Sequence, residues 1–277
     1  MTNKISIISI NIHGLRTKIH HIIDLIHQYK TDFIFLQETY VDTDFKAHKY
    51  LTKLGLRHAC FSLARHAGVG ILQTSDNWDI IHKNTDREGR VAIIQVKNKN
   101  DINPEEHTLV NIYTPVNRTK QPLFFDKLTD TLNQQYKHQK LIVGGDFNCV
   151  LNILDSTRGT VDTRARKNNN KKTQINILQN ILEEHNLFDP YRQKYPSGRD
   201  TTHTDQIHTP AGSRRLDKFY IHTSYTISKV KHLEASLNFT DHKAVFILLN
   251  NTRIQEQQFR SPHWKFNNTK LHQQRPH

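Results

Sequence analysis

Several apolar runs in this chain end at side chains that could carry out chemistry. Residues 141–148 read Leu-Ile-Val-Gly-Gly-Asp-Phe-Asn, so the carboxylate of Asp146 and the amide of Asn148 follow a run typical of a buried strand. Side chains at strand ends can meet at the mouth of a sheet, where a metal ion or a phosphate binds. Apolar runs with similar endings occur at Asn11, Gln37-Glu38-Thr39, Tyr113, Asp217 after Arg214-Arg215-Leu216, and Thr240-Asp241-His242. Together, in this order along the chain, these endings indicate a phosphodiesterase.

Phosphodiester hydrolysis requires an activated water, a cation beside the phosphoryl oxygens and help for the leaving oxygen. Glu38 is the strongest single candidate for a metal ligand, because Mg²⁺ takes one or two carboxylates and keeps several waters. A lone glutamate after a strand is usually a surface residue. The metal-ligand interpretation of Glu38 therefore depends on the other polar strand ends.

His242 is the candidate general base, because a neutral imidazole accepts a proton from water at physiological pH. The chain has 19 histidines, and one taken at random is more often structural or exposed. His242 differs in following Asp241, with Asp217 also available, and a carboxylate on the far ring nitrogen would fix its tautomer. The sequence has no Gly-x-Ser-x-Gly motif and no Walker loop, which disfavours a serine hydrolase and an ordinary nucleoside triphosphatase.

The composition favours a polyanionic partner. In 277 residues there are 39 Lys and Arg against 26 Asp and Glu, which gives a formal charge of +13. No apolar run approaches the roughly 20 residues that span a bilayer, and no secretory segment follows Met1. Cys60 and Cys149 are too few for a disulfide framework, so we expect reduced thiols in an intracellular protein.

The apolar pattern alternates between the strand period and the helix period, which predicts two layers of sheet with helices outside. Predicted helices cover residues 19–26, capped by Thr17, a segment opened by Pro122, and residues 174–185. Predicted strands cover residues 5–10, 33–36, 69–72, 80–81, 91–96, 109–113, 216–221, 225–233 and 244–249.

Two stretches depart from this alternation. Residues 158–172 are polar and basic, which fits either a solvated loop or an arm that contacts phosphates beside the site. From Asn250 onward Gln, Asn, His, Arg and Lys dominate. We therefore predict one domain over residues 1–249 and a polar linker or tail over residues 250–277.

Six ordered motifs together resemble those of the endonuclease/exonuclease/phosphatase superfamily. Within it, the chain resembles in particular the apurinic-endonuclease-like domain of the second open reading frame of LINE-type, non-LTR retrotransposons. Residues 263–267, His-Trp-Lys-Phe-Asn, resemble the linker ahead of the reverse transcriptase in those proteins. The motifs are Asn11-Ile12-His13-Gly14-Leu15-Arg16, Phe35-Leu36-Gln37-Glu38-Thr39, Asn111-Ile112-Tyr113-Thr114-Pro115, Gly145-Asp146-Phe147-Asn148, Arg215-Leu216-Asp217 and Thr240-Asp241-His242.

The resemblance implies an α/β fold, a DNase I-like four-layered sandwich of two packed sheets flanked by helices. It implies Mg²⁺, with Mn²⁺ as a substitute, bound by Glu38, Asn11 and Asp241. Tyr113 and Asn148 would hold the scissile phosphate. The remaining implied roles are assistance to the nucleophile or leaving group by Asp146, orientation of His242 by Asp217 and Asp241, a base or phosphate-stabilising role for His242, and phosphate or DNA contacts from Thr202, Arg215, Arg158 and Arg16.

Some details differ from the family pattern. His13 stands where many relatives have Asn, and Thr240 replaces a commoner Ser, but neither change removes a required group. Thr204 lies close enough to Thr202 to leave two registers for the phosphate-contacting threonine. The loop over residues 205–213 would be the hairpin that reads DNA shape.

The predicted function is a Mg²⁺-dependent DNA endonuclease that nicks one strand of duplex DNA. The nick would leave a 3′-hydroxyl that primes reverse transcription in retrotransposition, with a site of action in the nucleus. The predicted partners are double-stranded DNA and a reverse transcriptase domain of a longer polyprotein, with no membrane. The alternatives are an apurinic/apyrimidinic-site repair endonuclease, an inositol-phosphate or messenger-tail hydrolase, and a non-catalytic nucleic-acid-binding module.

Overall fold

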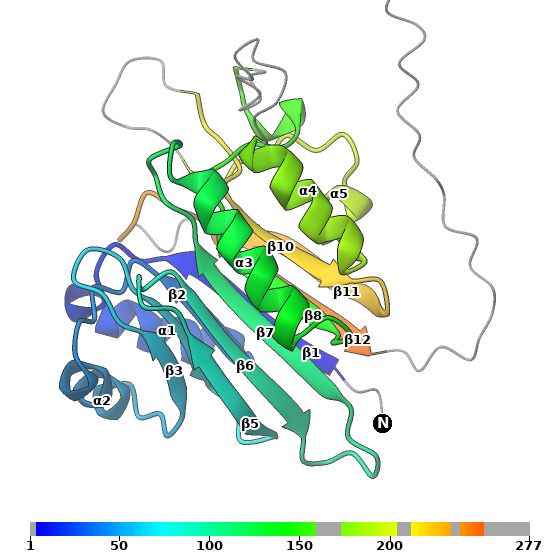
Figure 1. Ribbon diagram of the computed structural model, residues 1–277. Helices are drawn as coiled ribbons and strands as arrows, with labels where there is room; N and C mark the ends of the chain where they lie inside the picture. The colour runs from blue at the N-terminus through cyan, green and yellow to red at the C-terminus, as the bar shows by residue number, and fades with distance from the viewer. Residues whose placement is uncertain (1–3, 159–172, 204–211, 234–238, 252–277) are drawn as a thin grey trace, which may run out of the picture.

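The computed structural model describes residues 4–158, 173–203, 212–233 and 239–251. These residues form two six-stranded sheets that pack face to face between helices (Figure 1). The first sheet has the order β11 (Tyr225–Leu233), β12 (Ala244–Asn251), β1 (Lys4–Asn11), β2 (Phe33–Gln37), β4 (Val69–Gln73) and β3 (Ala59–Ser62). The second has the order β5 (Trp78–Thr85), β6 (Val91–Asn98), β7 (Glu106–Tyr113), β8 (Leu141–Asp146), β10 (Asp217–His222) and β9 (Leu187–Phe188).

Helices cover the outer face of each sheet. Helices α1 (Ile19–Tyr29) and α2 (Asp44–Lys53) pack against the first sheet through apolar residues such as Ile22 and Tyr50. Helices α3 (Gln121–Gln135) and α4 (Gln174–Glu184) pack against the second sheet. Short helices η1 (Leu15–Thr17), η2 (Ile153–Asp155) and α5 (Pro190–Lys194) complete the order of elements. The predicted four-layered α/β sandwich is confirmed.

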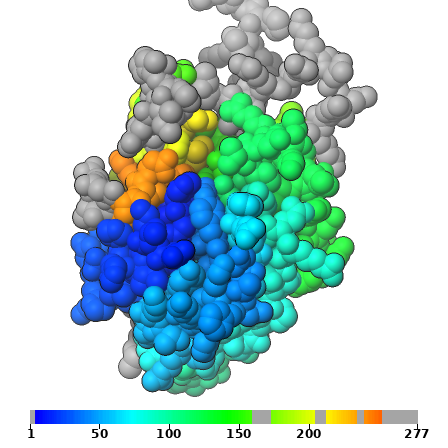
Figure 2. All heavy atoms as spheres, turned by 90° about the vertical axis from the view of Figure 1, so that its left-hand side faces the viewer, coloured from blue at the N-terminus to red at the C-terminus, as the bar shows by residue number. Residues whose placement is uncertain are grey.

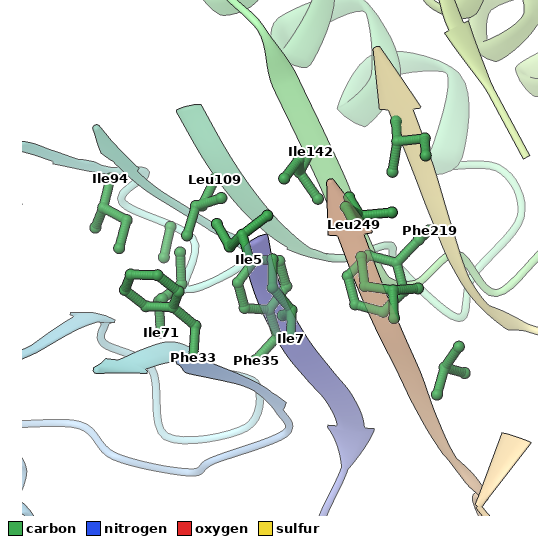
Figure 3. Close-up of a cluster of buried hydrophobic side chains, with 14 of the residues drawn as sticks. Ile5, Ile7, Phe33, Phe35, Ile71, Ile94, Leu109, Ile142, Phe219 and Leu249 are labelled. Atoms are coloured by element: carbon green, nitrogen blue, oxygen red, sulfur yellow. The ribbon is translucent and has the colours of Figure 1, made fainter. Parts of the chain in front are cut away.

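The core between the sheets is aliphatic and aromatic. Alternate residues of central strands point inward, as Ile5 and Ile7 do from β1, and Phe33 and Phe35 from β2, all at most 1% exposed (Figure 3). They meet inward side chains of the opposite sheet, among them Phe219 of β10, whose ring centroid lies 5.8 Å from that of Phe35. Burial of one such side chain contributes about 1.5–3 kcal/mol, so this layer fixes the sheets against each other.

Buried amides also join the sheets near the end of this core. The Nε2 atom of Gln37 donates to Oδ1 of Asn111 at 2.7 Å, and Nδ2 of Asn111 donates to the carbonyls of Leu36 and Gly70. A buried amide group without a partner is costly, so the hydrogen bonds of Gln37 and Asn111 favour one alignment of the two sheets.

Element boundaries differ from the sequence predictions in a few places. Thr17 does not cap α1, because it belongs to η1 and the helix begins at Ile19 with Lys18 as its N-cap. The predictions lacked η1, α2, β3, η2, β9 and α5. Helix α2 is capped by the Oγ1 atom of Thr43, which accepts from the backbone N–H of Lys46. Its low apolar content hides the helical period, because only Tyr50 is buried.

Strand β12 extends through Asn251, two residues beyond the predicted domain boundary. Residues 252–277 lie outside the described residues, so the linker or tail remains a prediction. No helix in the described part of the chain is long and apolar enough to cross a membrane.

We predict that His107 makes stability depend on pH. It is 1% exposed in β7, and burial lowers its pKa to about 4, below the value of about 6.5 expected in the unfolded chain. The unfolded state therefore binds the proton more readily, and stability falls as pH drops from about 6.5 towards 4. Between pH 7 and pH 5 the His107 contribution amounts to about 2 kcal/mol.

Urea unfolding at these two pH values measures this effect. The His107→Gln variant should lose about 2 kcal/mol less than the wild type over this interval, whereas His58→Gln, at an exposed position, should behave as the wild type. Equal pH dependence in wild type and His107→Gln would contradict the assignment.

Candidate active site

Strand ends from both sheets converge at one edge of the sandwich. In the first sheet, Asn11 at the end of β1 lies opposite Gln37 at the end of β2 in parallel register. In the second, Asp146 at the end of β8 is paired with Tyr113 of β7 on one side and Asp217 of β10 on the other. The predicted site residues on five strands are therefore neighbours in space.

Asn11 connects the two sheets at this edge. Its side-chain Nδ2 donates to Oε1 of Glu38 at 2.9 Å and to Oδ2 of Asp146 at 3.1 Å. Asn11 is 1% exposed, and its Oδ1 accepts from the backbone N–H of His13. The buried amide thus holds two carboxylates from different sheets in a fixed relation.

Glu38 follows β2 in a left-handed backbone conformation with φ of 52°. The hydroxyls of Tyr40 and Tyr113 donate to its carboxylate, and Nδ1 of His13 lies 3.0 Å from Oε2. Burial acts to raise the pKa of Glu38, but hydrogen bonds from Asn11, Tyr40 and Tyr113 outweigh it and the pKa is lowered. The carboxylate of Glu38 is therefore ionised at neutral pH, and its role as a metal ligand remains a prediction.

Asp146, the last residue of β8, and Asn148 form a second polar unit. Oδ1 of Asp146 accepts from the backbone N–H of Asn148 at 2.9 Å, and Asn148 has φ of 46°. Gly145 has φ of 138°, and a Cβ there would lie 2.0 Å from the carbonyl oxygen of Ile112. Only glycine fits at this position, so Gly145 is a steric requirement of the strand end that presents Asp146.

Left-handed backbone at non-glycine residues gathers around this edge. His13, Glu38, Tyr40 and Asn148 have φ between 46° and 54°. Such conformations each cost on the order of 1 kcal/mol or more and cluster at functional sites. Here the surrounding hydrogen bonds hold them in place.

His242 and Asp217 make a buried pair. Nδ1 of His242 lies 2.8 Å from Oδ2 of Asp217, with exposures of 9% and 0% for the two residues. Burial acts to lower the pKa of His242, but the carboxylates of Asp217, Asp146 and Asp241 raise it to about 10. The imidazolium is therefore favoured at neutral pH, which supports phosphate stabilisation over the role of general base.

The surroundings of Asp146 favour its neutral form, whereas those of His242 favour the charged form. Burial and the nearby charge of Asp217 raise its pKa, while His242 and hydrogen bonds from Asn148 and Asn11 act to lower it. A carboxyl group whose pKa moves towards neutrality is better suited to take a proton from water.

Thr202 holds the start of the strand that carries Asp217. It is 1% exposed, and its Oγ1 accepts from the backbone N–H groups of Leu216 and Asp217 at 3.0 Å each. In this arrangement the hydroxyl positions the start of β10, and its contact with phosphate remains a prediction. Thr204, the other register, lies outside the described residues.

His203 is a site neighbour that the sequence reasoning did not identify. It forms isolated backbone bridges with Arg214 and with His242, and its ring centroid lies 4.7 Å from that of His242. Its Nε2 is 3.5 Å from Oδ2 of Asp241. No apolar strand precedes it in the sequence, so only the bridge to the Thr-Asp-His segment reveals it.

The expected phosphate contact from Arg215 is wrong for this structure. The residue is 1% exposed, its Nε lies 2.8 Å from Oδ1 of Asp155, and its guanidinium also donates to Asp189. Lys218, fully buried, donates to the carbonyl of Cys149 and lies 3.7 Å from Asp155. A guanidinium with these partners supports β10 and the segment after β8 from inside the protein.

Arg16 and Arg158 are exposed, in η1 and at the end of a described segment. Their contacts with DNA remain predictions. The basic arm after Arg158 and most of the predicted reading hairpin, residues 159–172 and 204–211, lie outside the described residues.

The edge is accessible from outside. Figure 2 shows the segment that includes Thr240, in orange, beside the amino-terminal segments in blue. Oγ1 of Thr240 donates to the backbone carbonyl of Asn11 at 2.9 Å, which joins these segments. Asp241 next to it has a half-exposed side chain, so a phosphate or hydrated cation can approach.

The donor set fits a divalent cation. Glu38 supplies ionised carboxylate oxygens beside Asn11, and oxygen ligands are those that Mg²⁺ prefers. Among the described residues, Asp146, Asp217 and His242 form one cluster with ligand atoms within 4.8 Å, and His203, Asp241 and His242 form another. The arrangement can thus bind a cation, orient a phosphodiester and transfer protons.

Comparison with known proteins identifies the family. The model of the endonuclease/exonuclease/phosphatase family matches residues 8–242. The chain belongs to this family. It is therefore an enzyme of the phosphodiesterase class, as predicted from the motif order.

One curated relative and several solved structures are similar to the chain. It is 23% identical over 274 residues to the "Transposon TX1 uncharacterized 149 kDa protein" of Xenopus laevis, which covers 96% of the chain but 19% of that protein. The AP endonuclease LMAP of Leishmania major has a TM-score of 0.66 and 16% identity, over 90% of this chain and 89% of that one. The 3′ phosphatase NExo of Neisseria, bound to a product DNA hairpin, has a TM-score of 0.67 and 20% identity. This match covers 88% of this chain and 98% of that one.

We predict that Asp155 is required for stability. In Asp155→Ala, Arg215 and Lys218 lose a shared carboxylate while they stay buried, and breaking a buried pair costs about 3–5 kcal/mol. Chemical denaturation measures this. Glu88→Ala, which removes the exposed pair with Lys127, should cost less than about 1 kcal/mol. Equal losses in both variants would contradict a structural role for the buried network.

Proposed function

We propose that the protein is a Mg²⁺-dependent DNA endonuclease that nicks one strand of a duplex and leaves a 3′-hydroxyl able to prime reverse transcription. The observation that carries the proposal is the continuous set of contacts from Glu38 through Asn11 to Asp146, beside the Asp217–His242 pair. This set supplies cation binding, proton transfer and charge stabilisation within one site.

Each side chain has a proposed task. Tyr113 and Asn148 position the scissile phosphate, and Asp146 takes the proton from the attacking water. His242, held as an imidazolium by Asp217, donates to a phosphoryl oxygen and stabilises the developing charge. Glu38, with Asn11 and Asp241, would hold the Mg²⁺, and a bound Mg²⁺ neutralises the phosphoryl oxygens and the leaving oxygen.

The charge of the chain supports a nucleic acid as substrate. A formal charge of +13 favours a polyanion, and each neutralised phosphate adds affinity that salt weakens. A large duplex suits an open edge better than a small soluble phosphate does.

The retrotransposition role rests on the transposon relative and on the resemblance of the motifs. The chain spans 19% of that relative's length. We propose that the native protein acts in the nucleus as part of a longer polyprotein, with a reverse transcriptase domain as its partner.

Conversion of supercoiled plasmid to open circles tests the nuclease. We expect nicking in Mg²⁺ but not in EDTA, with losses of at least about 100-fold in Glu38→Ala and His242→Ala, because each removes a group that acts on the reacting phosphate. Glu183→Ala and His58→Ala, at exposed positions, serve as matched controls and should retain the wild-type rate. Nicking that survives in Glu38→Ala and His242→Ala would contradict the site assignment, and binding without nicking would favour the non-catalytic module.

Two duplexes separate the priming function from abasic-site repair. The proposal predicts comparable initial nicking rates on an intact duplex and on one with a single abasic site. The reason is that an enzyme that cleaves a target site acts on intact DNA and does not require a missing base. Nicked intact duplex should be extended directly by a DNA polymerase, which requires a 3′-hydroxyl. A preference of several hundred-fold for the abasic duplex would instead indicate a repair enzyme, and nicks that resist extension would exclude priming.

A further inference from the structure

A second potential cation site lies beside the proposed Mg²⁺ position. His203, Asp241 and His242 have ligand atoms within 4.8 Å of one another. Oδ2 of Asp241 is 3.5 Å from Nε2 of His203, and Oδ1 of Asp241 is 4.0 Å from Nε2 of His242. The same carboxylate therefore faces both imidazole rings with its two oxygens.

These separations are close to those of a tetrahedral metal site. With metal–ligand bonds of roughly 2.0–2.2 Å, the ligand atoms of a tetrahedral site lie roughly 3.4 Å apart. The Asp241–His203 separation already matches, and the Asp241–His242 separation exceeds it by an amount that rotation of the half-exposed Asp241 side chain can close. The exposed side of Asp241 leaves room for a water as the fourth ligand.

The partners of His242 favour a metal on its Nε2. Nδ1 of His242 lies 2.8 Å from Oδ2 of the fully buried Asp217. A ligating histidine almost always donates its other ring nitrogen to a carboxylate or carbonyl, which fixes the ring and raises its basicity as a ligand. Binding would release the proton from Nε2, as metal binding to histidine does in general.

Backbone contacts hold the two histidines next to each other. His203 and His242 are joined by an antiparallel bridge, and the N–H of Lys243 donates to the carbonyl of Thr202 at 2.7 Å. His203 is also bridged to Arg214, with both of its backbone groups bonded to that residue. The backbone positions of both histidines are thus fixed before any ion binds, which reduces the entropy lost on binding.

From this geometry we propose that His203, Asp241 and His242 form a site for a transition-metal ion such as Zn²⁺ or Co²⁺, distinct from the oxygen ligands at Glu38. Two imidazoles and one carboxylate suit Zn²⁺ and Co²⁺, whereas Mg²⁺ prefers oxygen ligands. The site uses His203, which has no part in the phosphodiester chemistry.

Occupancy of this site regulates the enzyme. This consequence rests on the proposed function, because an ion on Nε2 of His242 removes the donor that stabilises the phosphoryl oxygen. Asp241 would also be withdrawn from the Mg²⁺ position. Zn²⁺ therefore inhibits cleavage even when Mg²⁺ is in excess, because the two imidazoles favour Zn²⁺ over Mg²⁺ and Asp241 is the ligand that the two positions share.

Calorimetric titration with ZnCl₂ tests the site without any measurement of activity. Wild type should bind one Zn²⁺ with affinity at least tenfold above any background from the other histidines. His203→Phe keeps an aromatic ring against His242 but removes the ligand nitrogen, and His203→Gln is a second variant in case the first does not fold. Both should lose the strong site, whereas His58→Phe, at the opposite end of the first sheet, should keep it.

Inhibition of plasmid nicking by Zn²⁺ tests whether the site regulates the enzyme. In millimolar Mg²⁺, Zn²⁺ should inhibit the wild type and His58→Phe at a concentration at least tenfold lower than it inhibits folded His203→Phe or His203→Gln. Equal Zn²⁺ affinity in wild type and both His203 variants would overturn the site, and so would equal inhibition. Absence of Mg²⁺-dependent nicking in the wild type would instead contradict the proposed function, and the calorimetric result would still decide the site.

Discussion

The site depends on the side-chain amide of Asn11, which donates to Glu38 in one sheet and to Asp146 in the other. A single buried donor group can meet both carboxylates only when the two sheets are stacked in one alignment. The aliphatic and aromatic layer between them and the Gln37–Asn111 contact fix that alignment. Packing in the core thereby determines distances at the edge.

The buried charges around Asp146, Asp217 and His242 determine which groups of the site are protonated. Asp146 and Asp217 are adjacent in register and buried, so the pKa of Asp146 is raised and that of the neighbouring His242 is raised as well. Behind them, Arg215 and Lys218 neutralise Asp155 inside the protein. In β10, Lys218 therefore belongs to the buried ionic network around Asp155, whereas Asp217 pairs with His242 in the site.

The sequence predicted which strand ends lie close together better than it predicted the boundaries of the elements. Asn11, Glu38, Tyr113, Asp146 and Asp217 could be found because each ends or begins a strongly apolar strand, and parallel pairs such as β7 and β8 must end at one edge. Helix α2 was missed because it buries little apolar surface.

Tertiary contacts, which a one-dimensional pattern does not contain, explain the remaining differences. Arg215 lies in a motif beside Asp217, yet it precedes β10 and its side chain pairs with the buried carboxylates of Asp155 and Asp189. His203 meets His242 only through a bridge between segments 39 positions apart in the chain. Their roles follow from these contacts with segments that are distant in the sequence.

The most direct test of a single composite site is a double-mutant cycle on the rate of plasmid nicking. Glu38→Gln changes a group of the first sheet, Asp217→Asn changes one of the second, and the double variant combines them. Because both act on the same transition state through groups joined by Asn11 and Asp146, the double variant should lose little more activity than the worse single variant. Losses that multiply in full would show that the two sheets contribute independently and would contradict this structure of the site.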